Sequence, residues 1–239
     1  MNKGNLYLIP TVIGDGTQKE TLTSPIIKAV QKINVFIVEN IRTTRRYIRT
    51  IVKEKDIDNI TFYCFGKHNN IDLEKDFLPH ILRGQDVGII SESGLPCVAD
   101  PGSKIVAYAH DFDINVIPLV GPSSILLALM ASGLNGQKFT FNGYLPIDKS
   151  ERKKSIRRLE EKISREDQTQ IFIETPYRNN QLFEALINTC SKYTKICIAT
   201  DITTINENIK TKTAIEWKNT KVIIPKKPTI FILGKQVKF

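Results

Sequence analysis

The sequence has few of the residues that build metal centres and disulfide frameworks. Among its 239 residues are four cysteines and three histidines. No Cys-x-x-Cys pair occurs, and the histidines lie far from any cluster of ligand-type residues. Zinc sites and the disulfide frameworks of secreted proteins both need such close spacing. We therefore expect no metal, and reduced, mostly buried thiols at Cys64, Cys97, Cys190 and Cys197.

A long apolar run is absent as well. A membrane-spanning helix needs about 18 or more successive apolar residues, and the sequence contains no such run. The N-terminal residues Met1–Asn5 lead directly into a strand rather than into the apolar region of a signal peptide. We therefore expect a soluble, cytoplasmic protein with no membrane partner.

The composition suits a globular protein that binds an anion. An apolar content of 41% over 239 residues is enough for a full core, in one large or two small domains. The net charge of +9 favours an anionic partner.

Strand and helix patterns alternate along the chain, which predicts an α/β fold. In the first half we predict strands at 6–9, 35–38, 61–65, 87–90 and 115–119, and helices at 24–32, 44–54, 72–83 and 103–110. In the second half we predict strands at 139–144, 170–174, 195–200, 213–217 and 228–233, and helices at 149–164 and 179–190. The short connections between the late strands indicate a mixed sheet.

One loop concentrates residues that expose the backbone. It follows the strand Val87–Ile90 and ends at Gly102, where an Asp-Pro-Gly turn opens a helix. Gly94 has no Cβ, so a ligand can approach the main chain closely, and Pro96 and Pro101 fix φ. Ligands gather beyond the carboxyl ends of strands in open α/β sheets, which predicts a ligand site here. An ordinary βα turn is the alternative.

A second loop of the same kind follows the next strand. Gly121 and Pro122 precede two serines, Ser123 and Ser124, which open an apolar helix that stops at Gly133. We expect one of the serines as the N-cap of that helix. The hydroxyl and the free N–H groups at such a helix start can also hold a polar ligand, although capping alone explains the serines.

The two loops, with four further segments in the same order, resemble one family. The matched segments are 6–14, 38–42, 91–102, 120–124, 141–146 and 172–178. The chain resembles the tetrapyrrole methylase superfamily of S-adenosylmethionine-dependent methyltransferases. Within it, the resemblance is strongest to the bacterial 16S ribosomal RNA cytidine 2′-O-methyltransferases.

The resemblance implies two α/β domains with the cofactor cleft between them. The N-terminal domain, residues 1–119, would hold the substrate and part of the cofactor site. The C-terminal domain, residues 120–239, would carry the mixed sheet and the rest of the cofactor site. The resemblance also implies a homodimer and transfer of a methyl group from a cationic sulfonium, for which no metal is needed.

The matched loops also imply the site residues. The residues expected to bind S-adenosylmethionine are Pro10, Ser93, Gly94, Leu95, Val98, Pro122, Ser123, Ser124, Thr200 and Thr229. A ribose hydroxyl must lose its proton during transfer, so a base or a polarising cation should stand near it. The charged residues on the matched loops, and thus the catalytic candidates, are Glu39, Arg42, Glu174 and Arg178. Alternatively, Glu39 pairs with Arg42, and Glu174 with Arg178, for structural reasons only.

The chain departs from the family pattern in several places. Where the ribosomal RNA enzymes usually read Glu-Asp-Thr-Arg, this chain reads Glu39-Asn40-Ile41-Arg42, and their Asp-Ala-Gly-Thr-Pro is Glu92-Ser93-Gly94-Leu95-Pro96. An expected Thr-Lys is Thr203-Thr204, and the opening loop Thr11–Gly16 is altered. These changes bear more on the substrate than on the cofactor.

Two basic stretches bear on the substrate. The first has Arg42, Arg45, Arg46, Arg49 and Lys53 at three- and four-residue spacing, which predicts five cations on one helix face. This face suits phosphate contact, without sequence specificity. The second, 149–158, is diluted by acidic residues and is interpreted as a solvated helix face.

Three functions fit these features. The first is methylation of RNA, with ribosomal RNA as the substrate that the resemblance implies. The second keeps the cofactor but methylates a small molecule such as a tetrapyrrole, for which an apolar cavity with few cations would be needed. The third is a catalytically inactive RNA-binding relative, suggested by the altered loops.

Overall fold

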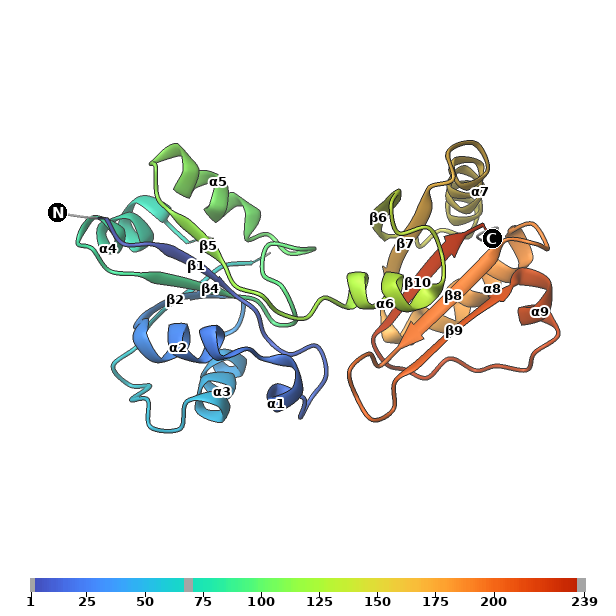
Figure 1. Ribbon diagram of the computed structural model, residues 1–239. Coiled ribbons are helices and arrows are strands. Elements are labelled where there is room, and N and C mark those ends of the chain that lie inside the picture. The colour runs from blue at the N-terminus through green and yellow to red at the C-terminus, as the bar shows by residue number, and fades with distance from the viewer. Residues whose placement is uncertain (1–2, 67–70, 236–239) are drawn as a thin grey trace. The chain divides into compact units, whose positions relative to one another are not determined.

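The structure is a computed structural model that describes residues 3–66 and 71–235. The chain divides into two units, residues 1–123 and 124–239, and each contains one five-stranded sheet (Figure 1). The predicted α/β fold class is thus confirmed. The boundary predicted between residues 119 and 120 lies a few residues before this division. No helix in the described residues is long and apolar enough to cross a membrane.

Short apolar strands build the N-terminal sheet. Its order is β3-β2-β4-β1-β5, and every pairing is parallel. The strands are β1 (Leu6–Ile9), β2 (Val35–Val38), β3 (Thr61–Cys64), β4 (Val87–Ile90) and β5 (Val116–Pro118). Every residue of β2 and β4 is buried, because helices cover both faces of a parallel sheet and leave its central strands no solvated side.

Helices cover the N-terminal sheet in pairs. The helices α2 (Ser24–Lys32) and α3 (Ile41–Ile51) pack on one face, and α4 (Leu78–Leu82) and α5 (Ser103–Asp111) on the other (Figure 1). A short helix, α1 (Gln18–Thr21), precedes α2. The neighbouring strands β1 and β4 therefore send their following loops to opposite faces. Such a switch in direction opens a crevice at the carboxyl ends of the strands.

One predicted helix of this unit is divided. The pattern at 72–83 predicts a single helix, but the structure has a π-helical turn at Leu73–Phe77 followed by α4. Pro79 at the start of α4 explains the division, because proline has no N–H to donate to the preceding turn.

The C-terminal sheet is mixed, as the short connections predict. Its order is β6-β7-β10-β8-β9; β6 pairs with β7 in parallel, and the other pairings are antiparallel. The strands are β6 (Phe139–Tyr144), β7 (Thr169–Glu174), β8 (Lys195–Thr200), β9 (Asn208–Thr213) and β10 (Thr229–Gly234).

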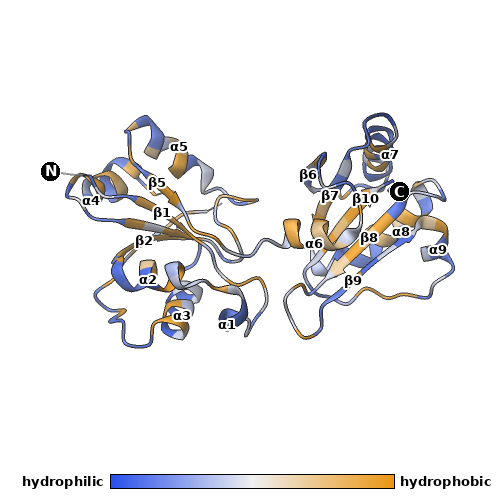
Figure 2. Cartoon of the chain, in the orientation of Figure 1, coloured by the Kyte–Doolittle hydropathy of each residue, from blue (hydrophilic) through white to orange (hydrophobic). Residues whose placement is uncertain are grey.

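Helices pack on both faces of this sheet too. On one face α7 (Lys149–Glu166), α8 (Asn179–Thr189) and α9 (Ala214–Lys218) enclose a core that includes the stacked rings of Phe172 and Phe231. The helix α6 (Ser124–Ser132) lies on the other face, against β9 and β10. Figure 2 shows that α6 is apolar along its length, whereas α7 is largely hydrophilic. A 3₁₀ turn, Pro176–Arg178, links β7 to α8.

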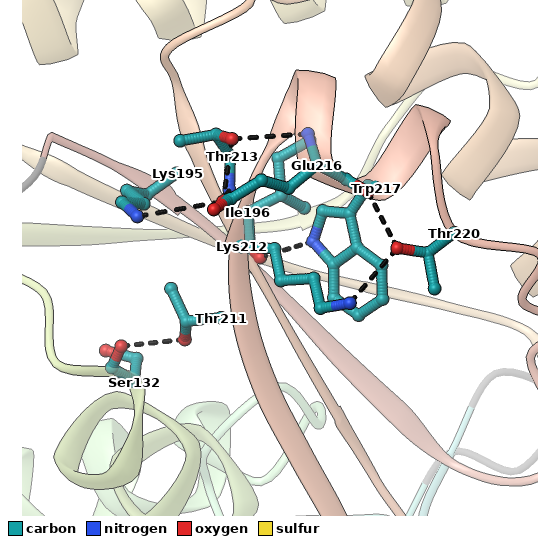
Figure 3. A network of polar contacts seen from close by, with 9 residues as sticks. All are labelled: Ser132, Lys195, Ile196, Thr211, Lys212, Thr213, Glu216, Trp217 and Thr220. Atoms are coloured by element: carbon teal, nitrogen blue, oxygen red, sulfur yellow. Dashed lines mark hydrogen bonds and ion pairs between the residues drawn. The ribbon is translucent and has the colours of Figure 1, made fainter.

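The strand predicted at 213–217 is wrong, because this segment forms α9. Alternating apolar side chains at 213–217 imitate a strand, but a capping box overrides the pattern. Oγ1 of Thr213 accepts the Glu216 N–H at 3.3 Å, and a Glu216 carboxylate oxygen accepts the Thr213 N–H at 2.7 Å (Figure 3). Reciprocal bonds of this kind satisfy the free N–H groups of a helix start. Trp217 then donates to the carbonyl of Ile196 at 2.8 Å and fixes α9 on the sheet.

Candidate functional site

The loop after β4 is tightly packed around Gly94. This residue is buried, and its φ of +70° lies in the left-handed region that favours glycine. A Cβ here would lie 3.0 Å from Cγ2 of Ile13 and 3.2 Å from the carbonyl oxygen of Pro122. The carbonyl of Gly94 accepts the Thr11 N–H at 2.9 Å. Gly94 thus joins the loops that follow β1, β4 and β5.

The backbone at Gly121 lies very close to Pro10. A Cβ on it would overlap Cβ of Pro10 at 2.2 Å and would lie 3.7 Å from Cδ2 of Leu95. The structure therefore brings four of the predicted cofactor residues together at the carboxyl ends of the N-terminal sheet: Pro10, Gly94, Leu95 and Pro122.

The other predicted cofactor residues of these loops are placed differently. Ser93 is exposed, and Val98 is exposed by 46%. Ser123 ends the N-terminal unit, and Ser124 begins α6 in the C-terminal unit.

Asp100 organises the rest of the β4 loop, a role the sequence suggests only through its Asp-Pro-Gly turn. Its carboxylate accepts the N–H groups of Cys97 at 2.8 Å and of Gly102 at 2.7 Å. Cys97 and Ala99 have positive φ angles of 67° and 65°. Non-glycine residues adopt this region at a cost of about 1–2 kcal/mol each, and such strain concentrates at functional sites. Burial raises the pKa of the Cys97 thiol to about 12, so it is protonated at neutral pH.

Glu39 is the half-buried acid at the end of β2. Its Oε1 accepts the N–H of Glu92 at 2.9 Å. Burial raises the pKa of Glu39 above its ordinary value; the bond from Glu92 opposes this, and the charges of Asp100 and Glu92 add to it. Within residues 3–66 and 71–235 Glu39 forms no ion pair with Arg42, whose side chain is exposed. The alternative of a structural Glu39–Arg42 pair is therefore wrong.

The C-terminal candidates form a buried polar cluster. Thr229 lies opposite both Glu174 and Thr200 in the sheet, so the three side chains share one row. Oγ1 of Thr229 lies 3.3 Å from Oγ1 of Thr200 and accepts from Nδ2 of Asn179 at 3.1 Å. Asn179 could not be predicted from the sequence, because a lone asparagine at a helix start has no distinctive pattern.

Glu174 and Arg178 form the ion pair predicted as the structural alternative. Nη2 of Arg178 lies 2.6 Å from Oε1 of Glu174, whose side chain is fully buried. The same oxygen accepts the Thr175 N–H at 2.6 Å. Oε2 of Glu174 is enclosed and has no hydrogen-bond partner in the described residues. This carboxylate is held in place by its neighbours, which weakens it as a candidate base.

The basic face of α3 is smaller than predicted. The helix ends at Ile51, so Lys53 lies beyond it, and Arg45 is paired with Asp58. The side chains of Arg42, Arg46 and Arg49 are exposed, and within the described ranges they make no ion pair or side-chain hydrogen bond. Thr44 and Ile48 face the core on the opposite side of the helix. Three arginines thus remain available to an anion.

Comparisons with known proteins agree with these features. The sequence profile of the family described as Tetrapyrrole (Corrin/Porphyrin) Methylases matches residues 11–216. The chain is 30% identical over 217 residues to the Ribosomal RNA small subunit methyltransferase I of Buchnera aphidicola subsp. Acyrthosiphon pisum, over 90% of this chain and 73% of that protein.

Two further relatives carry the same name. The protein of Halalkalibacterium halodurans is 29% identical over 82% of this chain and 64% of its own length. The protein of Bacillus subtilis is 30% identical over 77% of this chain and 59% of its own length. The chain therefore spans less than two thirds of these two relatives.

Proposed function

The chain belongs to the tetrapyrrole methylase family of S-adenosylmethionine-dependent methyltransferases, and from this premise we propose that it methylates ribosomal RNA at a ribose 2′-hydroxyl. Its relatives are named as small-subunit ribosomal RNA methyltransferases. The observation that carries the proposal is the exposed face of Arg42, Arg46 and Arg49, on the helix that follows β2. Phosphates of an RNA backbone are suited to such a face.

The loops around Gly94 fit a cofactor. A Cβ at Gly94 would crowd Ile13 and Pro122, so the missing side chain lets the loops after β1, β4 and β5 meet at this point. The predicted cofactor residues of these loops would hold S-adenosylmethionine, which when bound supplies a methyl group on a cationic sulfur. Thr200 and Thr229 in the C-terminal unit stay predicted cofactor residues, supported by their shared row in the sheet.

Glu39 is the favoured base of the four catalytic candidates. A ribose hydroxyl must give up its proton as the new bond forms. Burial raises the pKa of Glu39, and a carboxylate with a raised pKa is a stronger base. Oε1 is held by the Glu92 N–H. Arg42, three residues further along the chain, would orient or polarise the acceptor.

The change from aspartate to Asn40 does not disable this part of the fold. Oδ1 of Asn40 accepts the N–H groups of Arg42 at 2.9 Å and Thr43 at 3.3 Å, and so caps α3. Asparagine and aspartate are equally good N-caps. This departure from the family pattern therefore leaves the N-cap of α3 intact.

Mapping of methylation in ribosomal RNA tests the proposal. RNA from cells with and without the gene should differ by one 2′-O-methyl mark, and the purified protein with labelled S-adenosylmethionine should restore it. A failure of calorimetry to detect S-adenosylmethionine binding would identify an inactive relative. Binding without any RNA mark would favour a small-molecule substrate.

The same proposal covers assembly and location. The homodimer implied by the resemblance should appear as twice the chain mass in light scattering at micromolar concentration. A ribosomal substrate would place the protein in the cytoplasm, where fractionation should find it.

A further inference from the structure

The turn after β7 presents an aromatic ring to solvent. Tyr177 is the middle residue of the 3₁₀ turn Pro176–Arg178, and it is 80% exposed. Its ring therefore adds little to the core, because an aromatic side chain stabilises the fold through the area that it buries. Nζ of Lys226 lies 5.4 Å from the centroid of the ring, which is within the range of a cation–π contact. An open aromatic ring with a cation beside it is available to a ligand.

Buried contacts hold this turn in place. Arg178 directly follows Tyr177, and its ion pair with the buried Glu174 anchors it to the end of β7. Nε of Arg178 also donates to Oγ1 of Thr175 at 3.1 Å, and the N–H of Arg178 donates to the Thr175 carbonyl at 2.9 Å. The backbone that carries Tyr177 is therefore fixed, and a tyrosine has only two χ angles to order when a ligand binds.

Lys226 lies on a loop that is bonded to the helix start after this turn. The side chain of Asn180 donates to the Ile224 carbonyl and accepts the Ile224 N–H, each at 2.8 Å. Nδ2 of Asn179 donates to the carbonyl of the residue after Lys226, at 2.9 Å. Asn179 and Asn180 begin α8 directly after the turn, so these bonds fix the backbone around Lys226 relative to Tyr177. We call this pair the Tyr177–Lys226 platform.

The two segments that form the platform carry positive charge alone. Segments 175–181 and 218–228 contain no aspartate or glutamate. Their five cations are Arg178, Lys218, Lys221, Lys226 and Lys227. Among the described residues, Arg178 is paired with Glu174 and Lys227 with Asp201, whereas no carboxylate is paired with the other three. This surface therefore suits an anion such as an RNA backbone, whose phosphates lysines neutralise.

The platform lies at one end of the C-terminal sheet. Tyr177 comes three residues after Glu174, and Lys226 comes three residues before Thr229. Glu174 and Thr229 are opposite each other in the sheet, and Thr229 is also opposite Thr200. The platform therefore adjoins the row that contains the predicted cofactor residues of this unit.

We propose that the Tyr177–Lys226 platform binds one unpaired nucleotide of the RNA, other than the nucleotide that is methylated, with its base stacked on Tyr177 and a phosphate at Lys226. This inference rests on the proposed RNA substrate. Every base has a π face, so stacking on an aromatic side chain accepts any base. Proteins that bind single strands combine such rings with a positively charged surface that follows the backbone. The contact therefore supplies affinity and position without reading sequence.

Removal of the ring tests the stacking. Tyr177→Ala should weaken binding of a short fluorescein-labelled oligoadenylate by about tenfold in anisotropy titrations, because the loss of one stacked base has an effect of that order. Tyr177→Phe, which keeps the ring, should bind as the wild type does.

Tyr193→Ala is the matched control. Tyr193 is 69% exposed, and Nζ of Lys192 lies 4.9 Å from its ring centroid. It lies just before β8, at the opposite end of the sheet, so Tyr193→Ala should bind RNA normally. Equal effects of the two alanine variants, or no effect of Tyr177→Ala, would overturn the proposal.

The salt dependence of RNA binding tests the phosphate contact. Lys226→Gln should reduce the slope of log affinity against log salt by about 0.7, the value for one phosphate of a single strand. Lys192→Gln removes the cation beside the control ring and should leave the slope unchanged. An unchanged slope in Lys226→Gln as well would overturn the proposal.

A fluorescent ring tests the contact directly. The wild-type chain has one tryptophan, Trp217, which is buried. RNA should quench the added emission of Tyr177→Trp and leave that of Tyr193→Trp unaltered, because only the first ring would be stacked on a base. Absence of quenching in a folded Tyr177→Trp that binds RNA would overturn the proposal. So would light scattering in which a wild-type dimer becomes a monomer in Tyr177→Ala, because the ring would then belong to a subunit contact.

These readouts need no methyl transfer, so they separate the platform from the proposed function. If the wild type transfers no methyl group to ribosomal RNA, the proposed function fails, whereas an RNA affinity that depends on Tyr177 would still support the platform. If the wild type methylates ribosomal RNA but Tyr177→Ala binds it normally, the function stands and the platform is overturned.

Discussion

At the scale of single residues, Gly94 is the sharpest test of the cofactor site. Replacement by valine puts a branched side chain at a φ of +70° and within 3.2 Å of the Pro122 carbonyl oxygen. We expect S-adenosylmethionine binding to disappear in calorimetry, with a loss of stability of about 1–2 kcal/mol from the backbone alone. The smaller Gly94→Ala variant should bind weakly and remain folded. Wild-type affinity in both variants would place the cofactor elsewhere.

Glu39 carries the prediction about catalysis. Glu39→Gln keeps an oxygen to accept the Glu92 N–H but cannot take a proton. Methyl transfer should therefore fall by roughly a hundredfold or more, since general bases contribute about 10² to 10⁴. Cofactor and RNA affinity should stay near the wild-type values. Glu174→Gln is a poor comparison because it breaks a buried ion pair. Near-normal turnover of Glu39→Gln would direct attention to Arg42.

The raised pKa of Glu39 also predicts a pH dependence of stability. A carboxyl group whose folded pKa is raised favours the folded state when protonated. That contribution is complete below the unfolded pKa, near 4.5, and is lost as the pH rises through the folded value. Glu39→Gln does not titrate there. Its free energy of unfolding relative to the wild type should therefore rise between pH 4 and 7 in urea titrations. A constant or falling difference would contradict the raised pKa.

At the scale of elements, the exposed arginines of α3 form the surface on which the proposed RNA substrate would bind. Arg42→Glu with Arg49→Glu should weaken RNA binding and reduce its salt slope by about 0.7 for each phosphate that is no longer neutralised. Arg45 is left intact because it pairs with Asp58. The matched control, Lys153→Glu with Arg158→Glu on exposed positions of α7, makes the same charge change. Equal salt slopes of RNA binding in both double variants would show that the arginines of α3 are ordinary solvated residues.

Elements are predictable where one local signal dominates. The apolar runs at β1, β2 and β4 predict buried strands, and the Asp-Pro-Gly turn predicts the start of α5. The segment 213–217 is misleading because alternation and a capping box compete there, and the satisfied N–H groups of the helix start decide it. The division of the helix at 72–83 depends on Pro79, whose missing N–H the apolar pattern does not register.

The candidate site is predictable from the sequence only where local composition is distinctive. Gly94 and Pro122 stand in loops whose composition already predicts a ligand site. The Tyr177–Lys226 platform combines residues from two separate segments, and neither a single tyrosine nor a single lysine has a distinctive pattern. The bonding of Glu174 to Arg178 is one of two alternatives that the sequence offers, and spacing alone does not choose between an ion pair and a base.

At the scale of the whole molecule, hydrogen exchange tests whether both units bind the cofactor. A ligand at about 100 times its Kd stabilises the bound state by about 2.7 kcal/mol, which slows exchange through opening about a hundredfold. In the full chain, S-adenosylmethionine should protect 91–98 and 121–123 in the N-terminal unit. In the C-terminal unit it should protect 201–207 and 225–228, which adjoin Thr200 and Thr229. The exposed helix α7 should be unchanged. Protection confined to the N-terminal unit would remove Thr200 and Thr229 from the cofactor site, because a ligand that contacts them must also slow the opening of the segments that adjoin them.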